Sequence, residues 1–275
     1  MAIITLISDM GTSDHYVAAV KGAILSRMPQ ATIVDITHHI LPFNNMHAAF
    51  VLRNAWPEFP AGTVHIIGVN PEAIGNTRHV ALRHGGHYFI GADNGIFSLL
   101  FDEQPQEIIG LAPELDTAHL TFPSKHTFTK VACHLAQGGG LDELGERITD
   151  LQVQHHIRAT ITEDTIMGHV IHIDHYGNVF INITRDTYAA VARNRGCTLA
   201  FGRTRNNIRQ IHNTYSDVPP GETVAFFGDS GYLEVALNKG VSGSGGGAAQ
   251  LLGLKTNDVV RMEFAPVPNR TATPA

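Results

Sequence analysis

The sequence has few of the residues that mark several classes of protein. Its 275 residues include only two cysteines, Cys133 and Cys197. Two cysteines cannot make a disulfide framework, so we expect reduced, packed thiols. Basic residues number 19 against 25 acidic ones, and without a basic stripe we expect no binding to nucleic acid. No apolar run approaches a membrane span and the N-terminus lacks the features of a signal peptide, which predicts a cytoplasmic protein.

Histidine, by contrast, is abundant, at 17 residues, and raises the question of a metal site. His38-His39 and His155-His156 are adjacent pairs, whose members would point to opposite sides of a strand. His172 and Asp174 would share one strand face, but no third ligand follows at a recognisable spacing. We therefore expect solvated or buried histidines and no metal.

The first half of the chain alternates short apolar runs with helical spacing. Residues 3–7 and 32–36 read as buried strands, with helical spacing over residues 16–28 between them. A third run, residues 62–68, stops abruptly at the loop that begins Val69-Asn70-Pro71. Strand, helix, strand is typical of a parallel sheet, and ligands bind at the carboxyl ends of such strands. We expect the chemistry at that edge.

The rest of the chain changes character in its second half. Residues 80–90 carry a hairpin signature around Gly85-Gly86, and helical spacing over residues 127–137 ends at a glycine triplet. After Leu151, short alternating runs are separated by turn residues, with little helix between them. This pattern predicts a small β-barrel or β-sandwich. The length also favours two domains.

Six segments, taken together and in order, resemble a known family. They are residues 9–14, 34–38, 59–64, 92–95, 174–178 and 217–221. They are similar to the S-adenosylmethionine (SAM) hydrolases, also called SAM hydroxide adenosyltransferases, which are relatives of the fluorinase and chlorinase. The resemblance extends over about residues 3–264.

The resemblance implies a particular architecture. We expect an N-terminal α/β domain with a mostly parallel sheet over residues 1–155, a smaller C-terminal β-barrel domain over residues 165–264, and a disordered tail at residues 265–275. The family also implies a homotrimer, whose active sites lie between the N-domain of one subunit and the C-domain of its neighbour. Whether trimers pair into hexamers is left open. SAM is the substrate, and no cofactor is expected.

The chemistry explains what such a site must supply. SAM carries a sulfonium, so methionine departs as a neutral thioether and no acid has to protonate it. Attack by water or halide at the ribose C5′ is an in-line displacement. A protein can add alignment, a partly dehydrated nucleophile and fixed dipoles.

The resemblance places substrate contacts in both domains. Asp9 would hold the two ribose hydroxyls, because a carboxylate offers two acceptor oxygens, and Phe43 would form an aromatic wall. Ordinary alternatives are a helix-capping aspartate and a core aromatic. Adenine contacts are expected from Tyr176, Asn178 and Tyr215, and methionine contacts from Asp174 and Ser230. The full predicted set is Asp9, Phe43, Asp174, Tyr176, Asn178, Tyr215, Ser230 and Tyr232.

The water-positioning residues depart from the family pattern. The hydrolases use an aspartate, an arginine and a histidine, which align here with Asn70, Thr77 and Pro123. An asparagine cannot take a proton from water at neutral pH. Arg78 follows Thr77 directly, and His126 is either a pocket member or a solvated residue at a helix start.

The halogenases give a second comparison. Ser124 matches the serine that holds halide in the fluorinase, but the loop has Asn70 in place of a tyrosine and Ala73 in place of a threonine. Halide specificity is therefore unsupported. The predicted catalytic set is Asn70, Thr77, Arg78 and Ser124.

These observations predict hydrolysis of SAM to adenosine and L-methionine with a non-standard water-positioning set. Losing a charged base costs about 10²–10⁴ in rate, so we expect slow turnover. Two alternatives are a halide-dependent 5′-halo-adenosine synthase and a protein that binds adenosine or SAM but has lost the chemistry.

Overall fold

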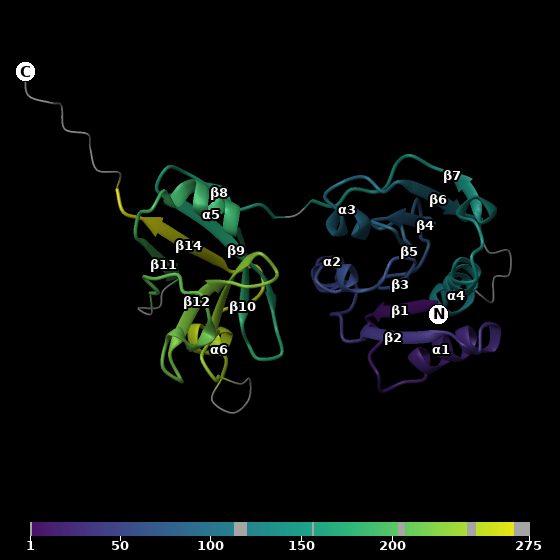
Figure 1. Ribbon diagram of the computed structural model, residues 1–275, viewed down its shortest axis with the longest axis horizontal. Coiled ribbons are helices and arrows are strands. Elements are labelled where there is room, and N and C mark those ends of the chain that lie inside the picture. The colour runs from purple at the N-terminus through teal and green to yellow at the C-terminus, as the bar shows by residue number, and fades with distance from the viewer. Residues whose placement is uncertain (1, 113–119, 156, 203–206, 241–245, 267–275) are drawn as a thin grey trace, which may run out of the picture. The chain divides into compact units, whose positions relative to one another are not determined.

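The structure is a computed structural model that describes residues 2–112, 120–155, 157–202, 207–240 and 246–266 (Figure 1). It divides into two compact units, Met1–His156 and Ile157–Ala275. The predicted tail at residues 265–275 lies outside the described residues from position 267 onward. Among the described residues, no helix is long and apolar enough to cross a membrane.

The first unit alternates strands and helices. Its elements are β1 (Ile3–Ser8), α1 (Tyr16–Arg27), β2 (Thr32–Thr37), α2 (Asn45–Arg53), β3 (Val64–Gly68), β4 (His79–His84), β5 (His87–Ala92), α3 (Ile96–Leu100), β6 (Glu107–Leu111), α4 (Pro123–Ala136) and β7 (Gly145–Arg147). Two short 3₁₀ turns, η1 (Trp56–Glu58) and η3 (Leu141–Glu143), complete it. The predicted strands at residues 3–7 and 32–36 and the helix at 16–28 are confirmed to within a residue or two.

The seven strands form one sheet in the order β2-β1-β3-β5-β4-β6-β7. The pairs β1–β2, β1–β3 and β3–β5 are parallel, whereas β4–β5, β4–β6 and β6–β7 are antiparallel. The expectation of a mostly parallel sheet is therefore wrong for half of it. The cause is the predicted hairpin, which is confirmed: β4 returns beside β5 through Gly85 and Gly86, both at positive φ.

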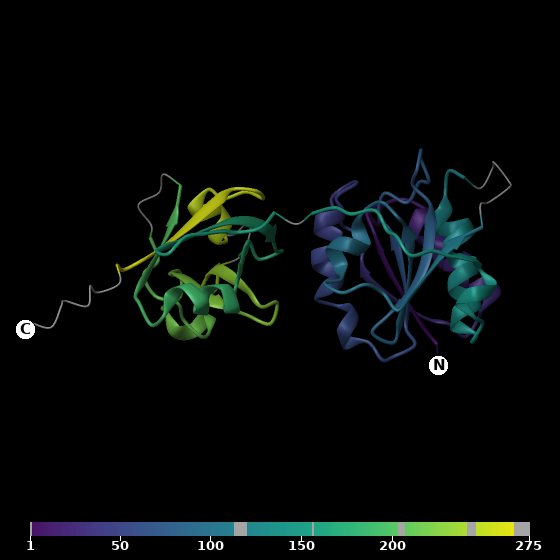
Figure 2. The same cartoon turned by 90° about the horizontal axis from the view of Figure 1, so that it is seen from above.

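Helices cover both faces of this sheet. Helices α1 and α4 lie on one face, and α2 and α3 lie on the other (Figure 2). Strand β3 serves both faces, because Ile66 belongs to the core under α1 and α4, while Ile67 belongs to the core under α2 and α3. The carboxyl ends of β1 and β3 thus present alternate residues to the two helix layers.

The second unit is built on an antiparallel sheet. Its elements are β8 (Thr160–Ile161), β9 (Thr165–Ile173), β10 (Val179–Thr184), α5 (Arg185–Ala192), β11 (Cys197–Phe201), η4 (Tyr215–Asp217), β12 (Thr223–Phe227), β13 (Tyr232–Leu237), α6 (Ala248–Leu252) and β14 (Val259–Phe264). The order is β11-β14-β9-β10-β13-β12, with β8 on β9. The sheet curls into a half-barrel around one apolar core. Bridges from Ile208 to Leu199 and from His212 to Phe226 reach its two edge strands, and a closed β-barrel stays a prediction.

Candidate functional site

Two predicted substrate residues meet at the carboxyl end of β1. The carboxylate Oδ2 of Asp9 accepts a hydrogen bond of 2.9 Å from the backbone N–H of Phe43. Phe43 has a φ of 61° and a side chain that is 73% exposed. A bulky residue with left-handed backbone and a solvent-facing ring is costly, and such residues cluster at ligand sites. Asp9 and Phe43 therefore form one exposed feature.

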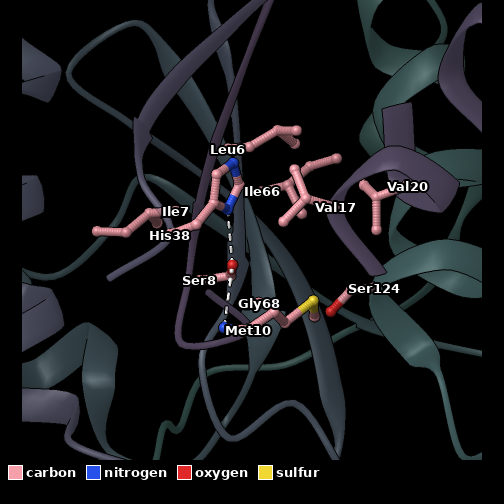
Figure 3. Close-up of a pocket in the computed structure, with 10 residues that line it drawn as sticks. All are labelled: Leu6, Ile7, Ser8, Met10, Val17, Val20, His38, Ile66, Gly68 and Ser124. Atoms are coloured by element: carbon pink, nitrogen blue, oxygen red, sulfur yellow. Dashed lines mark hydrogen bonds between the residues drawn. The ribbon is translucent and has the colours of Figure 1, made fainter. Parts of the chain in front are cut away.

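A small cavity lies between β1, β3, α1 and α4, and its lining includes Ser8 and Met10 on either side of Asp9 (Figure 3). Its volume of about 10 Å³ is close to what one water molecule needs. The polar lining comes from Ser8, His38 and Ser124, and Met10 and apolar side chains form most of the remaining wall. The sulfur of Met10 lies beside the Ser124 hydroxyl (Figure 3).

Ser124 places a hydroxyl in this cavity from the first turn of α4. The residue is 1% exposed, and its Oγ has no hydrogen-bond partner among the residues that the structure describes. A Cβ atom built on Gly68 would lie 2.9 Å from that Oγ and 3.4 Å from the Cβ of Ser8. Glycine at this position therefore keeps open the space into which the two serines converge.

A chain of polar groups leads away from the cavity. Ser8 Oγ lies 2.7 Å from Nδ1 of His38, and Nε2 of His38 lies 3.1 Å from Oδ1 of Asp35, at ion-pair distance although not in hydrogen-bond geometry. Lys21 donates to Oδ2 of Asp35 over 2.5 Å. Burial raises the pKa of Asp35, but the contacts with Lys21 and His38 outweigh it and lower that pKa overall. The sequence analysis missed this chain, although Ser8 and His38 lie at strand ends and Asp35 lies within β2.

The loop after β3 carries the other predicted catalytic residues. Asn70 has a φ of 44°, and its carbonyl accepts a hydrogen bond of 2.9 Å from the side chain of Asn94. The backbone N–H of Thr77 donates to the carbonyl of Ile74 over 3.1 Å. Both residues are half-buried. His126 is half-buried in α4, edge-on to Phe122.

Arg78 is held in ion pairs within its own unit. Its guanidinium donates to Asp93 over 3.2 Å and to the carbonyl of Asp150 over 2.6 Å. Asp93 is buried, and it also accepts from the backbone N–H of Gln152. Burial raises the pKa of Asp93 despite these two donors. These contacts assign Arg78 a role in fixing the loop to the segment at residues 150–152.

In the second unit, three predicted residues form a single turn between β9 and β10. Asp174 accepts hydrogen bonds from the backbone N–H groups of Tyr176 and Asn178, and from the Asn178 side chain over 3.0 Å. Asn178 is buried, whereas Tyr176 is exposed. The turn thus presents the Tyr176 ring on a base built from Asp174 and Asn178.

Tyr215 is fixed by a residue that the sequence analysis missed. Its hydroxyl donates to Oε1 of Glu234 over 2.6 Å, and its ring lies edge-on to Phe226. Glu234 is 4% exposed in the middle of β13. Burial raises the pKa of Glu234, and the charges of Asp174 and Asp229 raise it further. A lone charge inside the apolar run 233–237 was the available signal.

The remaining predicted residues lie in the same region of the second unit. Ser230 and Tyr232 follow Asp229, and the backbone N–H of Tyr232 approaches Ser230 Oγ at 3.4 Å. The structure therefore gathers Asp174, Tyr215 and the loop of Ser230 around Glu234. Among the residues described, no cluster of three histidine, cysteine or acidic side chains is arranged to hold a metal ion.

Comparisons with known proteins agree over both units. The family model described as "SAM hydroxide adenosyltransferase N-terminal domain" matches residues 4–145, and that of the C-terminal domain matches residues 168–261. A curated protein of Thermus thermophilus, "(R)-S-adenosyl-L-methionine hydrolase", is 30% identical over 95% of this chain and 100% of its own length. A protein of the same name from Methanocaldococcus jannaschii is 33% identical over 67% of this chain and 68% of its own.

More distant relatives and a solved structure fit the same pattern. A "Fluorinase" of Nocardia brasiliensis is 28% identical over 86% of this chain and 90% of its own length. The crystal structure of an uncharacterised conserved protein from Thermotoga maritima has a TM-score of 0.82 at 27% identity. It covers 94% of this chain and 99% of that one.

Proposed function

The chain belongs to the SAM hydroxide adenosyltransferase family, and from this membership we propose that it hydrolyses S-adenosyl-L-methionine to adenosine and L-methionine. The observation that carries the proposal is the unpartnered Ser124 hydroxyl in a water-sized cavity that is also lined by Ser8 and Met10, the residues on either side of Asp9. Ribose and water would then be held at one sheet edge. The reaction needs little more than their alignment, because the sulfonium is already a good leaving group.

Asp9 and Phe43 are the ribose side of the site. The carboxylate accepts from the Phe43 backbone through Oδ2 and retains acceptor capacity for the ribose hydroxyls. Holding the sugar there fixes its rotation, and the exposed Phe43 ring would cover it. Because the backbone of Phe43 is hydrogen bonded to the carboxylate of Asp9, the aromatic wall and the ribose contact depend on each other.

Ser124 is the contact for the attacking water. Its buried hydroxyl can accept from or donate to one water, and its place at the start of α4 puts the positive end of the helix dipole near a developing hydroxide. Asn70 and Thr77 would supply the polar rim of the pocket. Arg78 would hold their loop in place, since its Nε donates to Asp93 and its Nη2 to the carbonyl of Asp150.

The second unit suits the charged and aromatic parts of the substrate. SAM carries two cationic groups, a sulfonium and an ammonium, and Asp174 with the loop of Ser230 would bind the amino-acid end. Tyr215 and Tyr176 would stack on adenine, Asn178 would bind its edge, and Tyr232 would close the pocket. We propose a homotrimer in which each site joins the first unit of one subunit to the second unit of its neighbour. A cytoplasmic location stays a prediction.

A second candidate, halide-dependent formation of 5′-halo-adenosine, is favoured by Ser124 alone, which matches the halide-holding serine of the fluorinase. The loop does not support it, because Asn70 and Ala73 replace the tyrosine and threonine of that pocket. Water is the better nucleophile for a cavity with a hydroxyl donor and no cation among the residues that line it.

Incubation with SAM tests the proposal directly. We expect adenosine by chromatography from the native protein, none above the spontaneous rate from heat-inactivated protein, and none from Asp9→Ala. Added chloride or bromide should give no halonucleoside by mass spectrometry. Failure to form adenosine at high enzyme concentration would overturn hydrolysis, and tight calorimetric binding of adenosine without turnover would favour a binding protein. Light scattering tests the trimer.

A further inference from the structure

The inner end of the polar chain from Ser8 to Asp35 is buried in a largely apolar setting, where Ser8 Oγ also accepts a hydrogen bond of 3.4 Å from the backbone N–H of Met10 (Figure 3). Ser8 is 4% exposed and His38 is 5% exposed, and both face a cavity whose other walls are largely apolar. Their mutual hydrogen bond of 2.7 Å offsets part of the free energy that burying a hydroxyl and an imidazole costs, a cost that an alanine and a leucine would avoid altogether. The chain also has a direction, because it starts at the cavity and ends at Asp35, whose side chain is 39% exposed.

We propose that Ser8, His38 and Asp35 form a proton relay that serves as the general base for the attacking water. The proposal rests on the hydrolysis proposed above. It supplies what the loop after β3 lacks, since the amide of Asn70 has no atom that takes up a proton at neutral pH. None of the three residues needs to touch the sulfonium.

The step balances as follows. The water oxygen forms a bond to C5′ while the C5′–S bond breaks and its electron pair leaves with the neutral thioether. The water proton passes to Ser8 Oγ as the Ser8 hydroxyl proton passes to Nδ1 of His38. The resulting imidazolium carries a proton on Nδ1 and a second proton on Nε2. Nε2 lies 3.1 Å from Asp35, and the exposed carboxylate of Asp35 takes up the Nε2 proton and releases it to solvent.

The cavity geometry supports the first transfer. Ser8 and Gly68 are register partners on the adjacent strands β1 and β3. The space beside Gly68 is bounded by Ser8 on one side and the unpartnered Ser124 hydroxyl on the other. A water there would hydrogen bond to both serines, with Ser124 orienting it and Ser8 receiving its proton.

The charges around His38 favour its role as a base. From its own strand end it faces Asp35, and α1 contributes Lys21, which reaches Asp35 rather than the imidazole. The remaining cavity side chains come from β1, the loop after it, α1, β3 and α4, and none of them is ionisable. Among the residues that the structure describes, Asp35 is therefore the charged group at ion-pair distance from the imidazole. Because His38 must be neutral to accept a proton, turnover should fall in acid.

The decisive variant is His38→Asn, which keeps an acceptor for the Ser8 hydroxyl but takes up no proton. We expect kcat to fall about 100-fold, with KM for SAM and the Kd of adenosine unchanged, and the acid limb of the pH profile to disappear. Ser8→Ala should cause a similar loss, and the double variant should lose no more than either single variant. His39→Asn, at the adjacent exposed histidine, is the matched control and should behave as the native protein.

The outcomes separate this proposal from the function on which it rests. If the native protein forms adenosine, and folded His38→Asn keeps the native kcat and pH profile, the relay is wrong and hydrolysis stands. If the native protein forms none, hydrolysis falls and the relay with it. Circular dichroism checks folding. Should His38→Asn not fold, the smaller Ser8→Ala change decides: an unaltered kcat overturns the relay.

Discussion

The two units of the chain differ in the surroundings of their buried polar side chains. In the first, several buried polar side chains are paired within the unit: Ser8 contacts His38, Thr5 contacts His65, and Asp93 contacts Arg78. In the second, the charges that act on buried Glu234 are those of Asp174 and Asp229, which are negative as well. No aspartate, glutamate, lysine or arginine is among the residues that line the cavity of the first unit, whereas the second unit concentrates negative charge around Tyr215.

This difference matches the two halves of the proposed reaction. Water and ribose are uncharged, and a neutral, small cavity holds them without a counter-charge. SAM brings a sulfonium and an ammonium, so the mutual repulsion of several carboxylates in this region is relieved when such a ligand is bound. The comparison predicts that substitutions in the site residues of the first unit mainly lower kcat. Substitutions in those of the second unit should mainly weaken the binding of SAM and adenosine.

The largest effect should follow from Asp9→Asn in the first unit. The amide retains one acceptor oxygen but loses the charge, so the two ribose hydroxyls and the Phe43 N–H are no longer held together. Misalignment of this kind costs about 100-fold in kcat. Steady-state assay of adenosine formation measures it. Asp102→Asn is the control, because Asp102 is exposed and its carboxylate pairs with Arg53. If Asp9→Asn raised KM and left kcat unchanged, the first unit would contribute to binding rather than to the rate, which would contradict the comparison.

The next effect belongs to the second unit. Tyr215→Leu removes the ring proposed to stack on adenine and should weaken adenosine binding by about 1–3 kcal/mol, measured by calorimetry. Tyr215→Phe keeps the ring but deprives buried Glu234 of its donor, so it should lower the free energy of unfolding by about 1–3 kcal/mol with a smaller change in affinity. Glu234→Gln, which needs no charge stabilisation, should unfold less readily than Tyr215→Phe. Equal affinities for the Leu and Phe variants would exclude stacking.

How much of this was predictable depends on whether a feature is local. The strands ending at Ser8 and Gly68, the hairpin through Gly85 and the aspartate after β1 are properties of short segments, and periodicity and turn chemistry predict them. The strand order is not local: β4 lies between β5 and β6 because of pairing that no run of residues encodes. This is why the prediction of a mostly parallel sheet is wrong for half of the sheet.

The site shows the same limit. Asp9, Ser124 and Tyr215 could be assigned roles from the family resemblance, residue by residue. The contacts within the site could not be predicted, although Phe43 itself was assigned a role: Phe43 is 34 positions from Asp9, His38 is 30 from Ser8, and Glu234 is 19 from Tyr215. Contacts of this range exist only once the strands are placed side by side. Arg78 shows the same limit: nothing in its own segment predicts its contacts with Asp93 and Asp150, and its catalytic role stays a prediction.

Acid should distinguish the units by stability. Burial and the neighbouring His87 lower the pKa of His65 to about 3, so between pH 6.5 and 3 the unfolded chain binds a proton that the folded one does not. The contribution of His65 is intact above pH 6.5 and is lost as the pH falls, by at most about 1.4 kcal/mol per pH unit. Trp56, the single tryptophan, packs against His87, so its fluorescence during urea unfolding follows this unit.

Two variants sharpen this test. His65→Leu should flatten the dependence of unfolding on pH, whereas His155→Leu, at an exposed position, should leave it unchanged. Glu234 gives the second unit the opposite sign: its raised pKa adds stability in acid that is lost as the pH rises above the unfolded value. Glu234→Gln should remove that slope. Identical slopes for native protein and His65→Leu would show that His65 is not buried as described.

The smallest effect concerns the strained backbone at Phe43. With a φ of 61°, a non-glycine residue there costs about 1 kcal/mol, so Phe43→Gly should raise the free energy of unfolding by up to that amount, less the added freedom of the unfolded chain. The glycine N–H still reaches Asp9, but the ring is gone, so adenosine should bind less tightly. Arg193→Gly is the matched case in the second unit: φ is 44° and the side chain is exposed. It should gain similar stability and keep its affinity. If both variants bound adenosine as tightly as the native protein, the Phe43 ring would not contact the ligand, and ligand binding would not explain its strained backbone.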